Sequence, residues 1–255
     1  LIGGEFTAVN GSQKKFLARL DSNGLVDNSF AIDSGLNGSV YALAVQSDGK
    51  VIIGGNFTQV HGVARNRVAR LNVNGSLDTS FNPGTGANVY VRAVTLLHDG
   101  KVIIGGNFTS VDGVSINRIA RLNHDGSLDT TFNPGTGMDD WVFRVIQQAD
   151  GKLIVGGLFT LVNGVTQNKL VRLDGDGTMD TAFVATFIPT AAVQTLVLQP
   201  DGRLLVGGGF VTINSVSRIR LALLHTGDAD NDGTEDGADA LSLDPAESVD
   251  TDHDG

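Results

Sequence analysis

The chain has 255 residues, of which 34 are Gly, 5 are Pro and none is Cys, and 41% are hydrophobic. This composition is typical of a globular protein rich in tight turns, whose stability must come from packing and from any metal it binds. The net charge of −10 is uneven: residues 1–227 carry all 18 Lys and Arg against 17 acids, and residues 228–255 carry 11 acids. A nucleic-acid partner therefore has no electrostatic support. No apolar stretch is long enough for membrane insertion.

A Gly-Gly-x-Phe element, or one very like it, recurs along the chain with a fixed period. Its Phe residues stand at 6, 57, 108, 159 and 210, at intervals of 51 residues without insertion or deletion. A fixed period of roughly this length indicates a repeat architecture, in which each unit buries its faces against its neighbours.

Each repeat contains four short β-prone runs separated by turns with Gly. In the unit taken as the example these runs span 40–46, 50–57, 67–72 and 76–81. They predict a four-stranded antiparallel meander. The first two runs are apolar on both faces, as in a sheet covered on both sides. The sequence therefore predicts an all-β fold: a β-propeller, or an open arc of one, with about five such blades.

The turns within each blade are predicted from their Asp-Gly pairs. These pairs recur at 48–49, 99–100, 150–151 and 201–202, and Pro200 precedes the last of them. Pro suits the first position of a type I turn but not the positive φ of type I′. We therefore expect three-residue hairpin loops in which Gly202 and its equivalents are left-handed in a bulge.

A second series of Gly turns predicts an ion pair in each blade. The same loop type would place four Arg residues opposite four Asp residues, as Arg19/Asp27, Arg70/Asp78, Arg121/Asp129 and Arg172/Asp180. In the fifth unit both partners are replaced together, by Leu223 and Asn231. The joint loss indicates that the pair is structural.

Three strings in the second and third units identify a family. They are Gly-Gly-Asn-Phe-Thr-x-Val-x-Gly-Val (54–63, 105–114), Asn-Arg-[VI]-Ala-Arg-Leu-Asn (66–72, 117–123) and Gly-Ser-Leu-Asp-Thr-[ST]-Phe-Asn-Pro-Gly-Thr-Gly (75–86, 126–137). Together they closely resemble the delta-60 repeat family, over residues 1–224. The resemblance implies a β-propeller-like domain of a large bacterial surface or secreted protein, without an established catalytic activity. Residues 31–35 and 184–188 depart from the last string, so a ligand that needed those loops would be lost there.

An acidic segment after the repeats has the spacing of a calcium loop. Carboxylates stand at loop positions 1, 3, 5, 9 and 12, with Gly233 at position 6 and Thr234 at position 7; they are Asp228, Asp230, Asp232, Asp236 and Asp239. Ca²⁺ takes six to eight oxygen ligands, and a Gly allows the sharp turn around it. The segment is therefore predicted to bind Ca²⁺, the alternative being a disordered acidic linker.

A second, truncated copy of this pattern ends the sequence. It comprises Asp250, Asp252 and Asp254, 22 residues beyond the first. The tail resembles bacterial thrombospondin type 3 calcium repeats and, less well, a dockerin loop. The predicted domains are thus 1–224, the propeller repeats, and 225–255, a calcium-binding linker.

A partial form of the calcium pattern also occurs inside the repeats. The motif [DN]-x-[DN]-Gly-x-x-Asp is found at 21–27, 72–78, 123–129 and 174–180. A hairpin turn explains these residues equally well, and three ligands fall short of a full calcium shell. Both interpretations stay open at this point.

Two aromatic residues and two glycosylation sequons have alternative roles. Tyr90 and Trp141 stand where a loop between blades leads into a strand, so they are either buried strand ends or exposed rings that stack on sugars or grip a protein. The sequons at 56–58 and 107–109 lie within the repeated strand motif, which favours a structural role.

Catalytic motifs are scarce. The five His residues, at 61, 98, 124, 225 and 253, form no metal-ligand pair, and no Gly-x-Ser-x-Gly elbow, phosphate loop or Cys nucleophile occurs. Because the spacing of 51 residues never varies, no blade carries an elaborated loop. The sequence therefore predicts that the chain is not an enzyme.

Two functions fit these observations. The first is an extracellular or bacterial cell-surface scaffold that binds a protein or glycan partner, including an adhesive role, with Ca²⁺ stiffening the connector to a following domain. The second is a carbohydrate-binding or carbohydrate-active propeller of a larger secreted enzyme. In either case the sequence is expected to be a monomeric piece of a multidomain protein, because it starts within an apolar run and stops within a motif.

Overall fold

The computed structural model describes residues 1–32, 35–167, 169–183, 189–213 and 216–224. Every regular element within these ranges is a β-strand, which confirms the predicted all-β class. Nothing in the described residues forms a helix that could cross a membrane. The chain divides into two compact units, one from Leu1 to Gly137 and one that begins at Met138.

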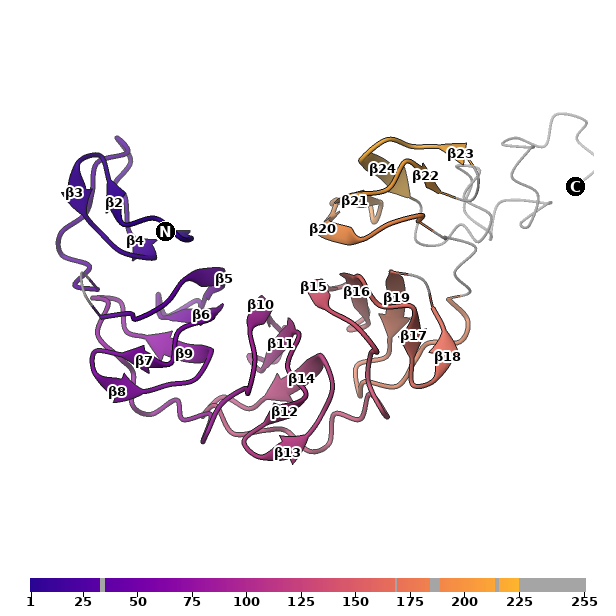
Figure 1. The fold of residues 1–255 in the computed structure, drawn as a ribbon, viewed down its shortest axis with the longest axis horizontal. Helices are drawn as coiled ribbons and strands as arrows, with labels where there is room; N and C mark the ends of the chain where they lie inside the picture. Colours follow the sequence, from indigo (N-terminus) through magenta and orange to yellow (C-terminus); the bar gives the residue numbers. More distant parts are fainter. Residues whose placement is uncertain (33–34, 168, 184–188, 214–215, 225–255) are drawn as a thin grey trace, which may run out of the picture. The chain divides into compact units, whose positions relative to one another are not determined.

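The second repeat shows the predicted blade. β5 (Val40–Val45) pairs with β6 (Val51–Gly55), and β6 pairs with β9 (Val68–Leu71), all antiparallel. The predicted fourth run adds the bridge between Leu71 and Leu77. The four-stranded blade is therefore confirmed, with its outermost strand reduced to this bridge. Figure 1 shows the three longer strands, β5, β6 and β9.

The same sheet recurs at the other repeats. In the first repeat the sheet consists of β1 (Ile2–Gly3) and β4 (Leu17–Ala18). The third repeat has β10 (Val91–Leu96), β11 (Val102–Gly106) and β14 (Ile119–Leu122), and the fourth has β15 (Val142–Gln147), β16 (Leu153–Gly157) and β19 (Leu170–Leu173). The fifth has β20 (Val193–Leu198), β21 (Leu204–Gly208) and β24 (Leu221–Leu224). β5, β10, β15 and β20 each form the first strand of a blade and are called inner strands below.

Each repeat also carries a short hairpin that the strand pattern did not predict. In the second repeat it consists of β7 (Gln59–Val60) and β8 (Val63–Ala64), joined by His61 and Gly62 with φ of 49° and 77°. Positive φ at both turn residues is typical of a type I′ hairpin. The equivalent hairpins are β2 (Ala8–Val9) and β3 (Ser12–Gln13), β12 (Ser110–Val111) and β13 (Val114–Ser115), β17 (Leu161–Val162) and β18 (Val165–Thr166), and β22 (Thr212–Ile213) and β23 (Val216–Ser217).

The hairpin loops between the first two strands have the predicted form. The Gln46 amide donates to Lys50 O at 2.8 Å, and the Gly49 amide donates to Gln46 O at 2.9 Å, which encloses a three-residue loop. Gly49 has a φ of 81°, and Gly202 has a φ of 87°. Both values lie in the left-handed region that Gly adopts at little cost, so this prediction is confirmed.

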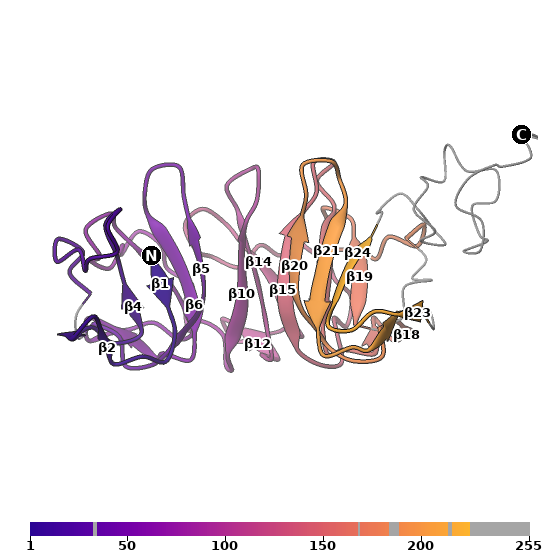
Figure 2. The ribbon, with the colours of Figure 1, turned by 90° about the horizontal axis from the view of Figure 1, so that it is seen from above.

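β6 is buried on both faces because its alternate residues enter two different cores. Ile53 packs in a cluster with Leu17 and Phe30 of the preceding repeat, whereas Ile52 packs with Val91 and Val94 of the following one. Side chains alternate between the two faces of a strand. The continuous apolar run in the sequence thus reflects a sheet held between two neighbours. β5 and β10 lie side by side in both views (Figures 1 and 2).

The Gly-Gly pair permits two close approaches to the inner strands. A Cβ on Gly54 would lie 2.6 Å from Val91 Cγ1 of the next blade, and a Cβ on Gly55 would lie 2.0 Å from Ser39 O of its own blade. Separations under about 3 Å are not found for real side chains, so any larger residue would push one inner strand away. The motif that revealed the repeat is therefore a packing device.

Candidate functional site

The four predicted ion pairs are all present. Each Arg Nε donates to Oδ2 of its Asp, at 2.8 Å for Arg19–Asp27, 2.7 Å for Arg70–Asp78, 2.7 Å for Arg121–Asp129 and 2.8 Å for Arg172–Asp180. The prediction from turn geometry is confirmed.

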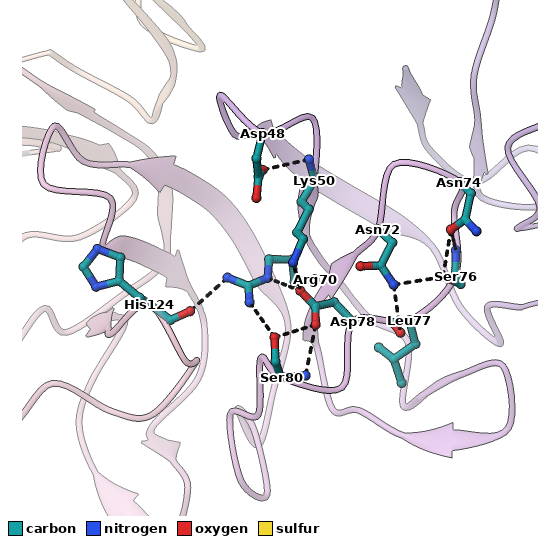
Figure 3. Close-up of polar contacts among 10 residues, drawn as sticks. All are labelled: Asp48, Lys50, Arg70, Asn72, Asn74, Ser76, Leu77, Asp78, Ser80 and His124. Carbon is teal, nitrogen blue, oxygen red and sulfur yellow. Dashed lines mark hydrogen bonds and ion pairs between the residues drawn. The ribbon is translucent and has the colours of Figure 1, made fainter.

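A Lys, which the sequence reasoning missed, joins three of the four ion pairs. Lys50 Nζ donates to Asp78 Oδ2 at 2.8 Å, and the Ser80 hydroxyl donates to Asp78 Oδ1 at 2.6 Å (Figure 3). Lys101 and Lys152 occupy the same place beside Asp129 and Asp180. The signal was available, because a Lys directly follows the Asp-Gly pair in all three repeats.

The Arg of the cluster also links adjacent blades. The Arg70 guanidinium lies over the Phe81 ring, with its carbon 5.0 Å from the ring centroid. Through Nη1 it donates to His124 O of the next blade at 2.9 Å (Figure 3). Arg19 makes the equivalent bond to Val73 O at 2.7 Å. One side chain thus joins its own hairpin to the neighbouring blade, which assigns these clusters a structural role.

The electrostatics of the clusters argue against proton transfer. Burial alone would raise the pKa of Asp180, but hydrogen bonds from Lys152, Arg172 and the Ala182 amide outweigh it and lower the pKa to about 2. Asp78 behaves in the same way: burial is outweighed by hydrogen bonds from Lys50, Ser80 and Arg70, and its pKa lies well below the usual value. Carboxylates that stay ionised at neutral pH are poor general acids.

The fifth repeat lacks this cluster. Leu223, in the Arg position, is 37% exposed. Arg203, in the Lys position, instead pairs with Asp201 of its own turn, through Nη2 at 2.7 Å. Asn231, in the Asp position, lies outside the described residues.

The residues of the partial calcium motif inside the repeats stabilise the hairpin turns and the ion pairs. In its best copy, Asp180 is held by Lys152 and Arg172, and Asp176 Oδ1 accepts bonds from the Thr178 amide and hydroxyl at 2.9 and 2.6 Å. Among the described residues, no three His, Asp or Glu side chains are grouped to hold a metal ion. The turn interpretation accounts for these residues.

The predicted calcium ligands of the tail lie outside the described residues. They are Asp228, Asp230, Asp232, Thr234, Asp236, Asp239, Asp250, Asp252 and Asp254. The calcium assignment and the division at residue 225 therefore stay predictions.

Thr58, the last residue of the first sequon (56–58), has a structural role. Asn37 Oδ1 accepts hydrogen bonds from the amides of Thr58 and Gln59, at 2.8 and 3.0 Å, and Asn37 Nδ2 donates to the Thr58 hydroxyl at 2.7 Å. Asn88 holds Thr109 in the same way. These bonds attach the segment before each inner strand to the short hairpin.

A β-bulge lies near the start of every inner strand. The pairing with the second strand skips one residue in each blade, and the skipped residues are Tyr41, Arg92, Phe143 and Gln194. Four different side chains thus occupy one structural position, whereas Gly-Gly follows in each second strand. Bulges redirect side chains and are common beside functional sites.

In the compact unit from Leu1 to Gly137, the bulge residues Tyr41 and Arg92 form a cluster with their neighbours. The rings of Tyr41 and Tyr90 meet edge to face, with centroids 6.1 Å apart. The Arg92 guanidinium lies 4.9 Å from the Tyr41 centroid and 6.0 Å from that of Tyr90. Arg67 approaches the Tyr90 ring at 5.6 Å, and the Tyr41 hydroxyl donates to Glu5 Oε1 at 3.4 Å. These five residues are called the Tyr–Arg cluster below.

Tyr90 and Trp141 occupy neither of the two predicted extremes. Both are half-buried. Trp141 meets Phe143 edge to face, with centroids 5.8 Å apart. Each ring therefore packs against the bulge residues while part of it faces solvent.

Solved structures similar to this chain include a WD40 β-propeller domain and enzymes. Virginiamycin B lyase from Staphylococcus aureus is 19% identical over 77% of this chain and 58% of its own (TM-score 0.44); a gluconolactonase from Xanthomonas campestris is 15% identical over 79% and 61% (TM-score 0.43); the WD40 β-propeller domain of Doa1 is 17% identical over 73% and 50% (TM-score 0.45). The chain spans less than two thirds of each of these proteins. At these identities the likeness shows the fold alone.

The prediction that the chain is not an enzyme was wrong to exclude catalysis. Proteins solved as a lyase and a gluconolactonase are among the similar structures. The likeness assigns no reaction to this chain. No curated protein matches the sequence.

A family of β-propellers matches the repeats themselves. The matched residues are 1–30, 46–81, 98–132, 148–183 and 199–228, one segment for each repeat. This confirms the predicted propeller-like repeat. The chain belongs to the family described as a domain of unknown function (DUF5122) beta-propeller.

Proposed function

We propose that this chain is a recognition module of a bacterial surface or secreted protein, which binds a protein or glycan through the starts of its inner strands. The observation that carries the proposal is the bulge position. A scaffold repeated at a constant spacing presents four different side chains there, Tyr41, Arg92, Phe143 and Gln194. Different side chains at one repeated structural position would give each blade its own contact surface.

The ion-pair clusters and the Asn37 contacts are occupied internally. Asp78, Lys50 and Arg70 satisfy one another, and Asn37 is bonded to the short hairpin. Aromatic and Arg side chains are enriched in recognition surfaces because they supply large contact areas and several donors. The bulge residues are of these types in three of the four inner strands.

The acidic tail supports the extracellular part of the proposal. Residues 228–239 have the ligand spacing of a calcium loop, and modules that work outside the cell bind Ca²⁺ with dissociation constants of about 10⁻⁴–10⁻³ M. Ca²⁺ would relieve the repulsion among clustered carboxylates and stiffen the connector to a following domain. An adhesive protein is one form of such a design.

A binding screen tests the proposal. The chain is applied to arrays of glycans and of bacterial and host surface proteins, in parallel with the variants Tyr41→Ala and Phe143→Ala. The control variant is Arg218→Ala, which changes an exposed side chain directly after β23. Specific binding that at least one bulge variant loses and the control retains would support the proposal. Binding that all variants retain, or an absence of any ligand, would overturn it.

A carbohydrate-binding or carbohydrate-active propeller is the second candidate. The edge-to-face pair of Trp141 and Phe143 favours it, because half-buried aromatic rings provide surfaces for sugar rings. Glycans bound on the array would be incubated with the chain and examined for cleavage. Binding without cleavage would support a recognition role without catalytic activity.

A further inference from the structure

One side of the fifth blade presents apolar side chains to solvent. On β24, Leu221 is 56% exposed and Leu223 is 37% exposed, while Ala222 and Leu224 are buried in the core of the blade. Side chains alternate between the two faces of a strand, so the two exposed residues lie on the same side of the sheet. Ile219, two residues before β24, is 69% exposed. Ile219, Leu221 and Leu223 are called the forward face below.

In other repeats the following blade covers the equivalent side. Val68 and Leu170 occupy the position of Leu221, at multiples of 51 residues, and both are fully buried. Val68 belongs to a cluster with Val91 of the third repeat, and Leu170 belongs to one with Val193 of the fifth. The forward face is therefore one half of the contact that this chain forms between neighbouring blades, and no described blade follows the fifth.

The forward face also lacks the polar groups that join a blade to the next repeat. Asn66, in the position of Ile219, donates through Nδ2 to Thr85 O in the linker to the next inner strand, at 2.8 Å. Arg70, which bonds to the next blade, is replaced by Leu223. Apolar residues gain stability when they are covered, whereas buried polar groups need partners. The fifth blade is thus suited to a partner that supplies no such linker.

The first repeat leaves the complementary side of a blade partly open. Ile2 is 37% exposed and Phe6 is half-buried; these two residues are called the backward face below. Their equivalents in the second repeat, Ile53 and Phe57, are fully buried in a cluster with Leu17. Leu17 is the first repeat's residue in the forward position, four periods of 51 residues before that of the fifth blade. Forward and backward residues therefore meet where the first two repeats join.

We propose that the forward face binds the backward face of a second copy of this chain, so that copies associate head to tail. A second copy carries the shape and the apolar chemistry that the chain already uses between its own repeats. Exposed apolar patches commonly mark protein interfaces, and a contact between two different faces links copies into a ring or an open chain. This contact is independent of the Tyr–Arg cluster and of any ligand bound at the inner strands.

Sedimentation velocity of the whole chain over a wide range of concentrations tests the contact. The mean mass of the wild type should rise above that of the monomer as the concentration increases. Leu221→Asp and Ile2→Asp each place an unpaired charge in the contact and should weaken association at least tenfold. Ile219→Asp, at the most exposed residue of the forward face, should do the same. Val114→Asp is the matched control, because this apolar residue of β13 is 48% exposed and lies outside both faces; it should leave association unchanged.

A mixture of two variants tests the head-to-tail arrangement. Leu221→Asp keeps its backward face and Ile2→Asp keeps its forward face, so neither should associate alone, whereas an equimolar mixture should form a dimer that grows no further. Each variant is first compared with the wild type by circular dichroism and thermal unfolding.

Three results would overturn the inference. The first is a wild type that stays monomeric at every concentration, as expected from the sequence. The second is association that Ile2→Asp leaves intact, because the forward face would then bind itself or a different surface. The third is a mixture of the two folded variants that forms no dimer.

Discussion

Lys50 Nζ and Arg70 Nε donate to the same oxygen, Oδ2 of Asp78, at 2.8 and 2.7 Å. The Lys comes from the hairpin between the first two strands and the Arg from the third strand, so a single buried carboxylate gathers three parts of one blade. Through His124 O, the Arg extends this connection to the next blade. The most polar residues of the repeat therefore hold the sheets together.

Asp78→Asn should destabilise the protein by about 3 kcal/mol or more, because it leaves two cations around a site that is only 7% exposed. The amide keeps the size of the side chain, so the loss reports charge and not volume. Chemical denaturation followed by circular dichroism measures the change in free energy of unfolding.

Asp27→Asn is the matched control for this prediction. Asp27 pairs with Arg19 alone and its side chain is 30% exposed, so solvent compensates for the lost charge and the effect should be clearly smaller. Equal effects at the two positions would contradict the assigned role of the buried cluster.

Stability should decline with acid as the pH falls from about 4 toward 2. The pKa of Asp180 is about 2 in the folded chain, below the value of about 3.9 for an unfolded Asp. A carboxylate with a lowered folded pKa contributes stability above its unfolded pKa, and this contribution is lost as the pH approaches the folded pKa. Thermal unfolding midpoints of wild type and Asp180→Asn, measured from pH 2 to pH 6, should therefore converge at low pH. A constant difference would refute the linkage.

Gly55→Ala should be strongly destabilising, at about 1–3 kcal/mol or more, because its new methyl group would lie 2.0 Å from Ser39 O. Gly175→Ala provides the comparison, since the nearest atom to its Cβ would be 3.5 Å away, an ordinary contact. Denaturation of the two variants should give a large and a small effect respectively. The reverse order would show that the inner strand can move aside at low cost.

Calcium should bind to the tail and not to the propeller hairpins. Calorimetric titration of the chain with CaCl₂ should give heat that Asp232→Ala abolishes, because position 5 of the loop loses its ligand. Asp176→Ala, which removes an exposed acid from the best propeller copy of the motif, should leave the titration unchanged. Heat that survives Asp232→Ala would place calcium elsewhere or show that it is adventitious.

Local sequence was sufficient to predict the turns and the ion pairs. Gly49 and Gly202 stand where a left-handed residue is required, and this defines the loop; the loop in turn sets which residues face each other, as for Arg70 and Asp78. The short hairpin at His61 was missed because two-residue strands are too brief to show an alternating pattern. The Lys of the cluster was missed because it comes from another turn.

By itself, the sequence determined the repeat, the strands and the calcium-like spacing of the tail, because these depend on residues close together in the chain. The tertiary structure alone showed that Tyr41, Tyr90 and Arg92 meet. Tyr41 and Arg92 lie on two inner strands about one repeat apart, and Tyr90 directly precedes the second of these strands, so only the packing of adjacent blades brings the three together. It also showed that Gly54 and Gly55 are needed at two different contacts, one between blades and one within a blade. No local pattern contains that information, since each contact depends on a strand that another part of the chain supplies.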